Sequence, residues 1–393
     1  VPIVADRDGH DFVDAALAAG AAAYLTSRAS EPTIGATAIA VDDTAASLMT
    51  LAAWARRQLD VPVVAVTGSV GKTSTKDLVA AALGATRRVT ANVRSFNNEQ
   101  GLPVTILGAP DGVEALVVEM GMRGFGEIVR LCAVAAPTIG VVTRVAASHT
   151  ERVGGIDGVA RAKRELIEQL PDDGVAVLNA DDERVAAMAA VAAGEVVTFG
   201  HGDAHVRVHD LELDRLARPR FRIETPWGSE RVELAASGAH MATNAAAAIA
   251  VAGIVEGSIG SAVEALARAS VSGMRMEIHR LPSGAVVVND AYNANPDSMR
   301  AALDAVAAMT AERRIAILGP MAELDDPAAG HARVKADADE RGIEVVATGT
   351  ALYGVDPTDD PVAAVGALGD GDVVLVKASR SAGLERIVER LLA

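Results

Sequence analysis

The sequence has 393 residues; half of them are hydrophobic, 3% are aromatic, and the formal net charge is −16 at pH 7. This length allows two or three domains with a large core built mainly from small aliphatic side chains. The negative charge disfavours nucleic acid or an anionic membrane as the main partner, but it leaves open a phosphorylated substrate bound by locally positive groups.

The single cysteine, Cys132, rules out an internal disulfide, and its apolar helical surroundings predict that it is buried. The sequence contains no uninterrupted run of about 20 apolar residues that would predict a membrane span, and no signal peptide is recognisable. We therefore expect a cytoplasmic α/β protein. Because residue 1 is Val1 and not Met, we also expect the natural N-terminus to lie further upstream.

The first 58 residues are predicted to form a small α/β piece, short for a free-standing domain. Helix Phe12–Ala19 leads into strand Ala23–Thr26, and strand Ala38–Val41 leads into helix Ala45–Leu59.

From residue 61 to 195, apolar strands alternate with helical segments, which predicts a mostly parallel sheet with helices on both faces. In such a sheet, ligands bind beyond the carboxyl ends of the strands. A glycine-rich turn after residue 66, the carboxylate of Glu119 and the segment after Thr143 all fall at such ends. The predicted strands are Val61–Val66, Ala115–Glu119, Thr138–Thr143 and Gly174–Asn179.

The pattern changes from residue 196 to 236, where segments 206–213 and 221–225 alternate apolar and polar residues as half-buried antiparallel strands do. Helix Ala242–Gly253 follows, and Ser272-Gly273 is predicted to be a linker. A strand–helix alternation resumes at residue 274 and predicts a separate doubly wound domain. Its predicted elements are strands Val286–Asn289, Ile315–Leu318, Val345–Thr348 and Val373–Lys377 and helices Ser298–Ala308, 332–341 and Leu384–Leu392.

The strongest functional signal is the stretch Val-Thr-Gly-Ser-Val-Gly-Lys-Thr-Ser-Thr at residues 66–75, between a predicted strand and helix Thr73–Leu83. A glycine-rich turn that opens a helix presents backbone N–H groups to phosphate oxygens. Lys72 would add charge at the phosphates, and Thr73 a hydroxyl on Mg²⁺. Val66 stands where the usual phosphate-loop pattern has glycine, and a tight strand–helix turn with a chance lysine is the alternative.

Three further residues are candidates for chemistry, and each has a structural alternative. Glu119 ends an apolar strand and offers oxygen ligands to Mg²⁺, but it is also compatible with a solvated strand end. His149 is a candidate ligand or a surface histidine. Lys163 lies in a helical segment, where the alternative is an ordinary solvated lysine.

Several stretches, in order along nearly the whole chain, resemble those of the Mur ligase family. The sequence from Tyr292, Tyr-Asn-Ala-Asn-Pro, favours the members that add D-alanyl-D-alanine to UDP-N-acetylmuramoyl-tripeptide. The stretches are Thr67–Ser74, Phe96–Pro103, Val118–Gly121 with Gly126–Ile128, Ser148–Glu151 with Ala162–Glu165, Gly238–Ala245 and Asn289–Met299, with weaker matches at Leu318–Leu324 and Val376–Ser381.

The resemblance implies a three-domain α/β fold. It assigns residues 1–58 to a truncated UDP-substrate domain and 59–272 to an ATP-binding domain with a small antiparallel insert. Residues 273–393 become a Rossmann-like domain for the amino substrate. It also implies an ATP-dependent amide ligase of peptidoglycan precursor synthesis, acting as a monomer with one or two Mg²⁺ ions through an acyl phosphate.

The same resemblance assigns roles to residues. It makes Thr73, Glu119, His149 and Lys163 metal ligands, the last after carbamylation, and it makes Lys72, His149 and Lys163 catalytic. The implied nucleotide contacts are Thr67, Gly68, Ser69, Val70, Gly71, Lys72, Thr73, Ser74, Asn244, Arg275, Asp290, Asn293 and Asn295. The implied substrate contacts are Asn97, Asn98, Ser148, Lys377, Ser379 and Arg380. Asn293 and Asn295 are also good turn residues, and both readings stay open.

The sequence departs from the family at three places: an N-terminal element that helps bind the uridine nucleotide is absent, Arg144 follows Thr143 where asparagine is usual, and Pro320 replaces an acidic residue. Alternative readings are a related ligase with another amino acid or a folate-like substrate, a nucleotide-dependent switch, and an inactive nucleotide-binding paralogue.

Overall fold

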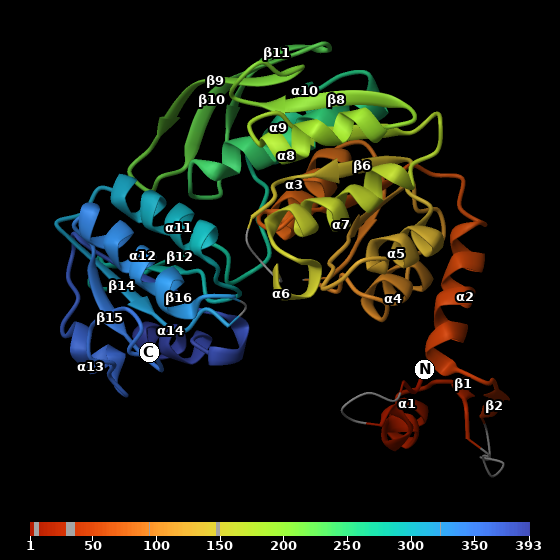
Figure 1. Ribbon diagram of the computed structural model, residues 1–393, viewed down its shortest axis with the longest axis horizontal. Helices are drawn as coiled ribbons and strands as arrows, with labels where there is room; N and C mark the ends of the chain where they lie inside the picture. The colour runs from red at the N-terminus through yellow and green to blue at the C-terminus, as the bar shows by residue number, and fades with distance from the viewer. Residues whose placement is uncertain (4–7, 29–35, 94, 147–149, 323) are drawn as a thin grey trace.

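The computed structural model describes residues 1–3, 8–28, 36–93, 95–146, 150–322 and 324–393. Three sheets of two, nine and five strands follow one another along these residues. In Figure 1 the N-terminal piece and the C-terminal sheet lie on opposite sides of the nine-stranded sheet. The domain boundaries at 58 and 272 stay predictions.

The N-terminal piece contains a parallel pair of strands and three helical segments. No residue of α1 is buried, whereas α2 packs against the central domain. Arg56, at the end of α2, donates from Nε to the carbonyl of Ala135 at 2.8 Å and from Nη1 to that of Leu59 at 2.7 Å. The segments are η1 (Gly9–Phe12), α1 (Val13–Ala18), β1 (Ala23–Thr26), β2 (Thr37–Ala40) and α2 (Thr44–Arg56).

The central sheet has the strand order β11-β10-β9-β8-β7-β6-β3-β5-β4, and it is parallel from β9 to β4. All side chains of β3 and β5 are buried, as expected for parallel strands covered on both faces. The strands are β3 (Val63–Thr67), β4 (Val89–Ala91), β5 (Ala115–Glu119), β6 (Ile139–Val142), β7 (Val175–Asn179), β8 (Glu195–Gly200), β9 (Val206–Leu213), β10 (Pro219–Thr225) and β11 (Gly228–Glu233).

Helices cover both faces of this sheet. One face packs against α3, α9 and α10, and the other mainly against α4, α5, α7 and α8. Cys132 lies buried in the second of these cores, as predicted. The helices are α3 (Lys72–Leu83), α4 (Gly101–Leu107), α5 (Glu127–Ala135), α6 (Thr150–Val153), α7 (Ile156–Glu168), α8 (Glu183–Ala186), η2 (Ala187–Val191), α9 (His240–Glu256) and α10 (Gly260–Leu266).

The predicted antiparallel strands belong to the same sheet. Strand β9 pairs in parallel with β8, at Phe199 and Val206, and only β9, β10 and β11 pair antiparallel. The sequence pattern does not predict strand β8, because residues 196–200 fall in the segment of changed character. The antiparallel part therefore lengthens the large sheet instead of forming a separate layer.

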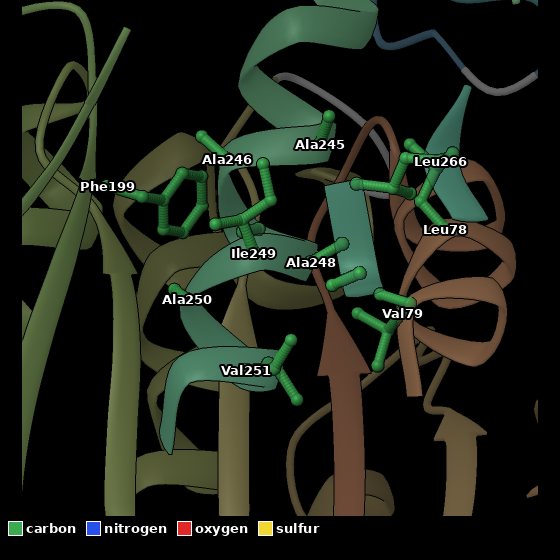
Figure 2. Packing of buried hydrophobic residues seen from close by; sticks show 14 of the residues in the cluster. Leu78, Val79, Phe199, Ala245, Ala246, Ala248, Ile249, Ala250, Val251 and Leu266 are labelled. Carbon is green, nitrogen blue, oxygen red and sulfur yellow. The ribbon is translucent and has the colours of Figure 1, made fainter. Parts of the chain in front are cut away.

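Helix α9 is rich in alanine, and its position accounts for these small side chains. It packs on the sheet beside α3, and most of its residues are buried, so small side chains let it approach both neighbours closely. Figure 2 shows Ile249 of α9 near Phe199, with Val79, Leu78 and Leu266 on the α3 side. A helix that is apolar on all sides is a core helix. Among the residues described, none of the helices combines the length and apolarity needed to span a membrane.

The C-terminal sheet has the order β12-β13-β16-β14-β15, in which only β12 is antiparallel to its neighbour. Helices α11 and α12 cover one face, and α13 and α14 the other. The elements are β12 (Glu277–Arg280), β13 (Val286–Asn289), α11 (Pro296–Ala308), β14 (Arg313–Leu318), α12 (Pro327–Glu340), β15 (Glu344–Ala347), α13 (Pro361–Val365), β16 (Asp372–Lys377), η3 (Arg380–Ala382) and α14 (Glu385–Leu392).

Two glycines in the first turns of helices provide a matched test of this packing. A Cβ on Gly158 in α7 would lie 1.7 Å from the carbonyl oxygen of Val153, whereas a Cβ on Gly260 in α10 would meet nothing within 4 Å. We expect Gly158→Ala to lower the free energy of unfolding by about 1–3 kcal/mol, because the backbone of α6 must move. Gly260→Ala should be as stable as the wild type or more so. Thermal unfolding of both variants checks this, and equal midpoints would contradict the close approach of α6 and α7.

Candidate active site

The turn after β3 has the geometry of a phosphate loop. Gly71 precedes α3 with a φ of 85°, and a Cβ there would lie 2.9 Å from Oδ1 of Asn244. A Cβ on Gly68 would lie 1.9 Å from Oγ1 of Thr143, so neither position has room for a side chain. Helix α3 has no side-chain cap, and the N–H groups of its first turn have no partner within the helix. The turn therefore presents backbone N–H groups and the positive end of a helix to an anion.

Lys72 lies over this turn. Its Nζ donates to the carbonyl oxygen of Gly68 at 2.8 Å and to that of Ser69 at 3.4 Å. The ammonium group is thus held at the mouth of the loop, where the family resemblance expects it to meet phosphate.

A hydrogen-bond network joins the loop to the end of β5. The hydroxyl of Thr73 donates to Oε2 of Glu119 at 2.6 Å, and Nδ2 of Asn97 donates to Oε1 at 2.6 Å. Glu119 is only 1% exposed, so the solvated alternative for this residue is wrong. Arg275 donates from Nη2 to Thr73 at 3.0 Å and to the hydroxyl of Ser95 at 2.8 Å. The Thr73 hydroxyl therefore contacts both the buried carboxylate of Glu119 and the guanidinium of Arg275, which lies outside the central sheet.

Lys163 is buried at 3% exposure in α7, and its alternative as a solvated lysine is also wrong. Burial lowers the pKa of this lysine well below its ordinary value, and the positive charge of Lys72 lowers it further. The amine is therefore more readily neutral, and a neutral amine is nucleophilic.

Two buried charges pair in the C-terminal domain. Nζ of Lys377 lies 2.6 Å from Oδ2 of Asp290 and donates to the carbonyl of Asn293 at 2.8 Å. Asn295 caps α11: its side chain accepts from the N–H of Ser298, and the Ser298 hydroxyl accepts from the N–H of Asn295. Asn295 therefore has a local structural role as a helix cap and does not lie in a turn, and its nucleotide contact stays a prediction.

Some predicted substrate residues already have protein partners. Asn98 accepts from the N–H of Gly101 at 2.9 Å at the start of α4. Ser379 accepts from the N–H of Ala322 at 2.9 Å, and Arg380 pairs with Glu385 at 2.7 Å. Ser379 and Arg380 do not line the cleft described below.

Most of the predicted site residues line one cleft of about 1260 Å³ between the central and C-terminal domains. Ser148 and His149 lie outside the described residues, and Thr67 lies buried behind the loop. The predicted residues on the cleft wall are Gly68, Ser69, Val70, Gly71, Lys72, Thr73, Ser74, Asn97, Asn98, Glu119, Lys163, Asn244, Arg275, Asp290, Asn293, Asn295 and Lys377. Sequence reasoning missed several others, namely Ser95, Asp181, His201, His240 and Tyr292.

Metal binding here would depend on mixed oxygen ligands. Within the described part of the chain, no group of three or more His, Cys, Asp or Glu side chains could hold a metal ion. The pair formed by Thr73 and Glu119 supplies a hydroxyl and a carboxylate instead, which suits Mg²⁺ because this ion keeps several of its waters.

The loop after β14 is held in place by buried groups. Nε2 of His331 accepts from the N–H of Met321 at 3.1 Å, which leaves Nδ1 to donate to the carbonyl of Pro327 at 2.6 Å. The ring of Tyr353 packs against His331, and its hydroxyl donates to the carbonyl of Gly319 at 2.8 Å. Residues 319–322 of the weak motif therefore form a loop that is held at the carboxyl end of the C-terminal sheet.

Comparison with known proteins places the chain in a family. Residues 66–252 match the Mur ligase middle domain, and residues 274–380 match the Mur ligase, glutamate ligase domain. The chain is 38% identical to the UDP-N-acetylmuramoyl-tripeptide--D-alanyl-D-alanine ligase of Mycobacterium tuberculosis (strain ATCC 25618 / H37Rv). The alignment, 449 positions long with its gaps, covers 99% of this chain and 88% of that protein. The chain belongs to the Mur ligase family.

Solved structures agree with this assignment. The fold of this Mur ligase superposes on MurF from Acinetobacter baumannii with a TM-score of 0.89 at 26% identity, covering 100% of this chain and 89% of the other. It superposes on the MurF ligase of Thermotoga maritima in complex with ADP with a TM-score of 0.84 at 25% identity, covering 99% and 92%. The family resemblance and the α/β fold predicted from the motifs are confirmed.

The His331 contacts generate a pH-dependent prediction. Burial lowers the pKa of His331 below its ordinary value of 6.5, so in acid the unfolded chain binds a proton more readily than the folded one. The stabilisation by His331 is therefore complete above about pH 6.5 and is lost as the pH falls. We expect His331→Phe to be less stable by about 1–3 kcal/mol at pH 7.5, because the buried N–H of Met321 loses its acceptor. Urea unfolding should show this difference shrink at pH 5.5, and a constant difference would contradict the argument.

Proposed function

We propose that this protein is an ATP-dependent amide ligase that joins D-alanyl-D-alanine to UDP-N-acetylmuramoyl-tripeptide in peptidoglycan precursor synthesis. The similarity to the Mycobacterium tuberculosis ligase, which extends over 99% of the chain, is the observation that carries the proposal. The cleft supports it, because the phosphate loop and residues of the C-terminal domain line the same cavity.

The reaction has two steps that balance. A carboxylate oxygen of the tripeptide attacks the γ-phosphorus of ATP and ADP leaves, which gives an acyl phosphate. The dipeptide amine, after losing a proton, attacks the acyl carbon and phosphate leaves. Lys72 and the N–H groups at the start of α3 would stabilise the negative charge of the transferring phosphoryl group.

The residues present fit one or two Mg²⁺ ions. Thr73 and Glu119 would hold one ion, with His149 and carbamylated Lys163 as further ligands. The guanidinium of Arg275 donates to Thr73, which supports a cation site at this position. Mg²⁺ would supply positive charge that lessens the repulsion between ATP and the substrate carboxylate.

Residues from two domains would complete the site. Arg275 already reaches Thr73, and Asp290 and Lys377 lie on the opposite wall of the cleft. Closure of the cleft would keep water from the acyl phosphate while the amine approaches. Since one chain supplies both walls, we propose that it acts as a monomer. ATP and a UDP-linked substrate favour the cytoplasm.

A ligase with a different amino substrate, or an inactive nucleotide-binding paralogue, is the second candidate. The sequence Tyr-Asn-Ala-Asn-Pro from Tyr292 disfavours the first, and the intact Lys72, Thr73 and Glu119 disfavour the second. A substrate panel separates them: turnover that ignores D-alanyl-D-alanine would contradict our proposal.

ADP release with the UDP-tripeptide and D-alanyl-D-alanine, together and singly, tests the function. The wild type should turn over only when both are present. Lys72→Ala should lower the rate by at least about 10²-fold, the typical loss for one group that stabilises transition-state charge. Lys335→Ala, which removes a lysine paired with Asp339 on α12, is the control and should keep full activity. Near-normal turnover of Lys72→Ala would remove this residue from the mechanism.

Carbamylation of Lys163 has its own test. The neutral amine would add to CO₂ and lose a proton, which makes a carboxylate-like ligand from a cation. We expect ¹³C NMR of the enzyme equilibrated with ¹³C-bicarbonate to show a carbamate signal that is lost in Lys163→Met. A fully active enzyme without that signal would defeat the proposal.

A further inference from the structure

The segment between the two larger domains is held in an unusual backbone conformation. Met274 and Met276 have φ angles of 60° and 50°, in the left-handed region that side chains other than glycine rarely occupy. Arg275 lies between them. Such a conformation persists only when neighbouring groups hold it, and it occurs preferentially at functional positions.

The turn after β13 holds this segment. The N–H of Tyr292 donates to the carbonyl of Met274 at 3.3 Å, and the N–H of Met276 donates to Oδ1 of Asp290 at 3.1 Å. On the other side, the N–H of Ser272 donates to Oδ2 of Asp77 in α3, at 2.7 Å. The backbone around Arg275 is therefore fixed from both domains.

Tyr292 also contacts the Arg275 side chain. Cζ of Arg275 lies 3.9 Å from the centroid of the tyrosine ring, which is a close cation–π contact. The same guanidinium donates from Nη2 to Thr73 and Ser95 on the phosphate-loop side. A planar guanidinium stacked on a ring keeps its N–H groups pointing outward from the ring edge, which an ammonium group does not.

One nitrogen of this guanidinium is left over. Nη1 of Arg275 is buried and has no hydrogen-bond partner among the described residues, while Arg275 and Tyr292 both line the cleft. A buried cationic N–H without an acceptor is costly, and an anionic oxygen that reached Nη1 when the cleft closes would satisfy it.

We propose that Tyr292 is a positioning residue that holds the guanidinium of Arg275 toward the phosphoryl group of the substrate. This inference rests on the proposed function, and it gives a role to a residue to which the motif analysis assigned none. The tyrosine acts through its ring face and through its backbone N–H, and its hydroxyl is not needed. Its effect therefore passes entirely through Arg275.

A double-mutant cycle tests this. Tyr292→Ala should lower kcat by about tenfold, equivalent to ~1.4 kcal/mol, whereas Tyr292→Phe, which keeps the ring, should stay within about twofold of the wild type. Arg275→Ala should lower kcat by about 10²-fold. The double variant should be no slower than Arg275→Ala alone, because the tyrosine then has nothing to position. Thermal midpoints of all four proteins show that the variants are folded.

Multiplied losses in the double variant, or a Tyr292→Phe variant as slow as Tyr292→Ala, would overturn the inference. A fully active Tyr292→Ala enzyme would overturn it as well. Wild-type protein without D-alanyl-D-alanine-dependent ADP release would instead contradict the proposed function. In that case the dissociation constant of ATP is measured by calorimetry, without the peptide substrates, for the wild type, the two alanine variants and the double variant. Coupling between the two substitutions supports the inference about Tyr292, and additive effects overturn it.

Discussion

The hydrogen bond between Thr73 and the buried carboxylate of Glu119 ties the site to the fold. It joins the first turn of α3 to the end of β5, which pairs directly with β3. Thr73 donates to one oxygen of the buried Glu119 side chain and Asn97 donates to the other, so both buried oxygens have a hydrogen-bond partner. The phosphate loop and the two oxygen groups that we propose as Mg²⁺ ligands are consequently one unit, positioned by adjacent parallel strands.

The C-terminal domain contributes through a second buried pair, Asp290 and Lys377, at the ends of the neighbouring strands β13 and β16. Asp290 accepts from Lys377 with one oxygen and from the N–H of Met276 with the other. The same carboxylate thus fixes a strand end and the strained segment that carries Arg275. Breaking the buried pair of Asp290 and Lys377 would be costly, so Asp290 stays in place. It thereby keeps the segment of Arg275 directed toward the phosphate loop.

The sequence predicted the strands that end at the site, because β3, β5 and β13 are continuous apolar runs followed by glycine, carboxylate or asparagine. It also predicted the burial of Cys132. It did not reveal Ser95, whose hydroxyl matters only because Arg275 arrives from 180 residues away. The pairing of β9 with β8 and the stacking of Tyr292 on Arg275 are equally non-local. Patterns within one segment specify its conformation, whereas contacts between segments depend on how the whole chain packs.

The negative net charge of the protein is compatible with an anionic substrate because the cleft contains positive groups. A net charge of −16 would repel ATP and a UDP-linked acid if it acted as one field, yet salt screens charges more than about 8 Å apart. Within the cleft, Lys72 and Arg275 lie among low-dielectric walls, where their attraction for anions is weakly screened. Burial lowers the pKa of Lys163 and so favours its neutral amine, which adds little to this attraction. The amides of the phosphate loop and the guanidinium of Arg275, which both face this cleft, therefore offer local donors to an anion in spite of the negative net charge.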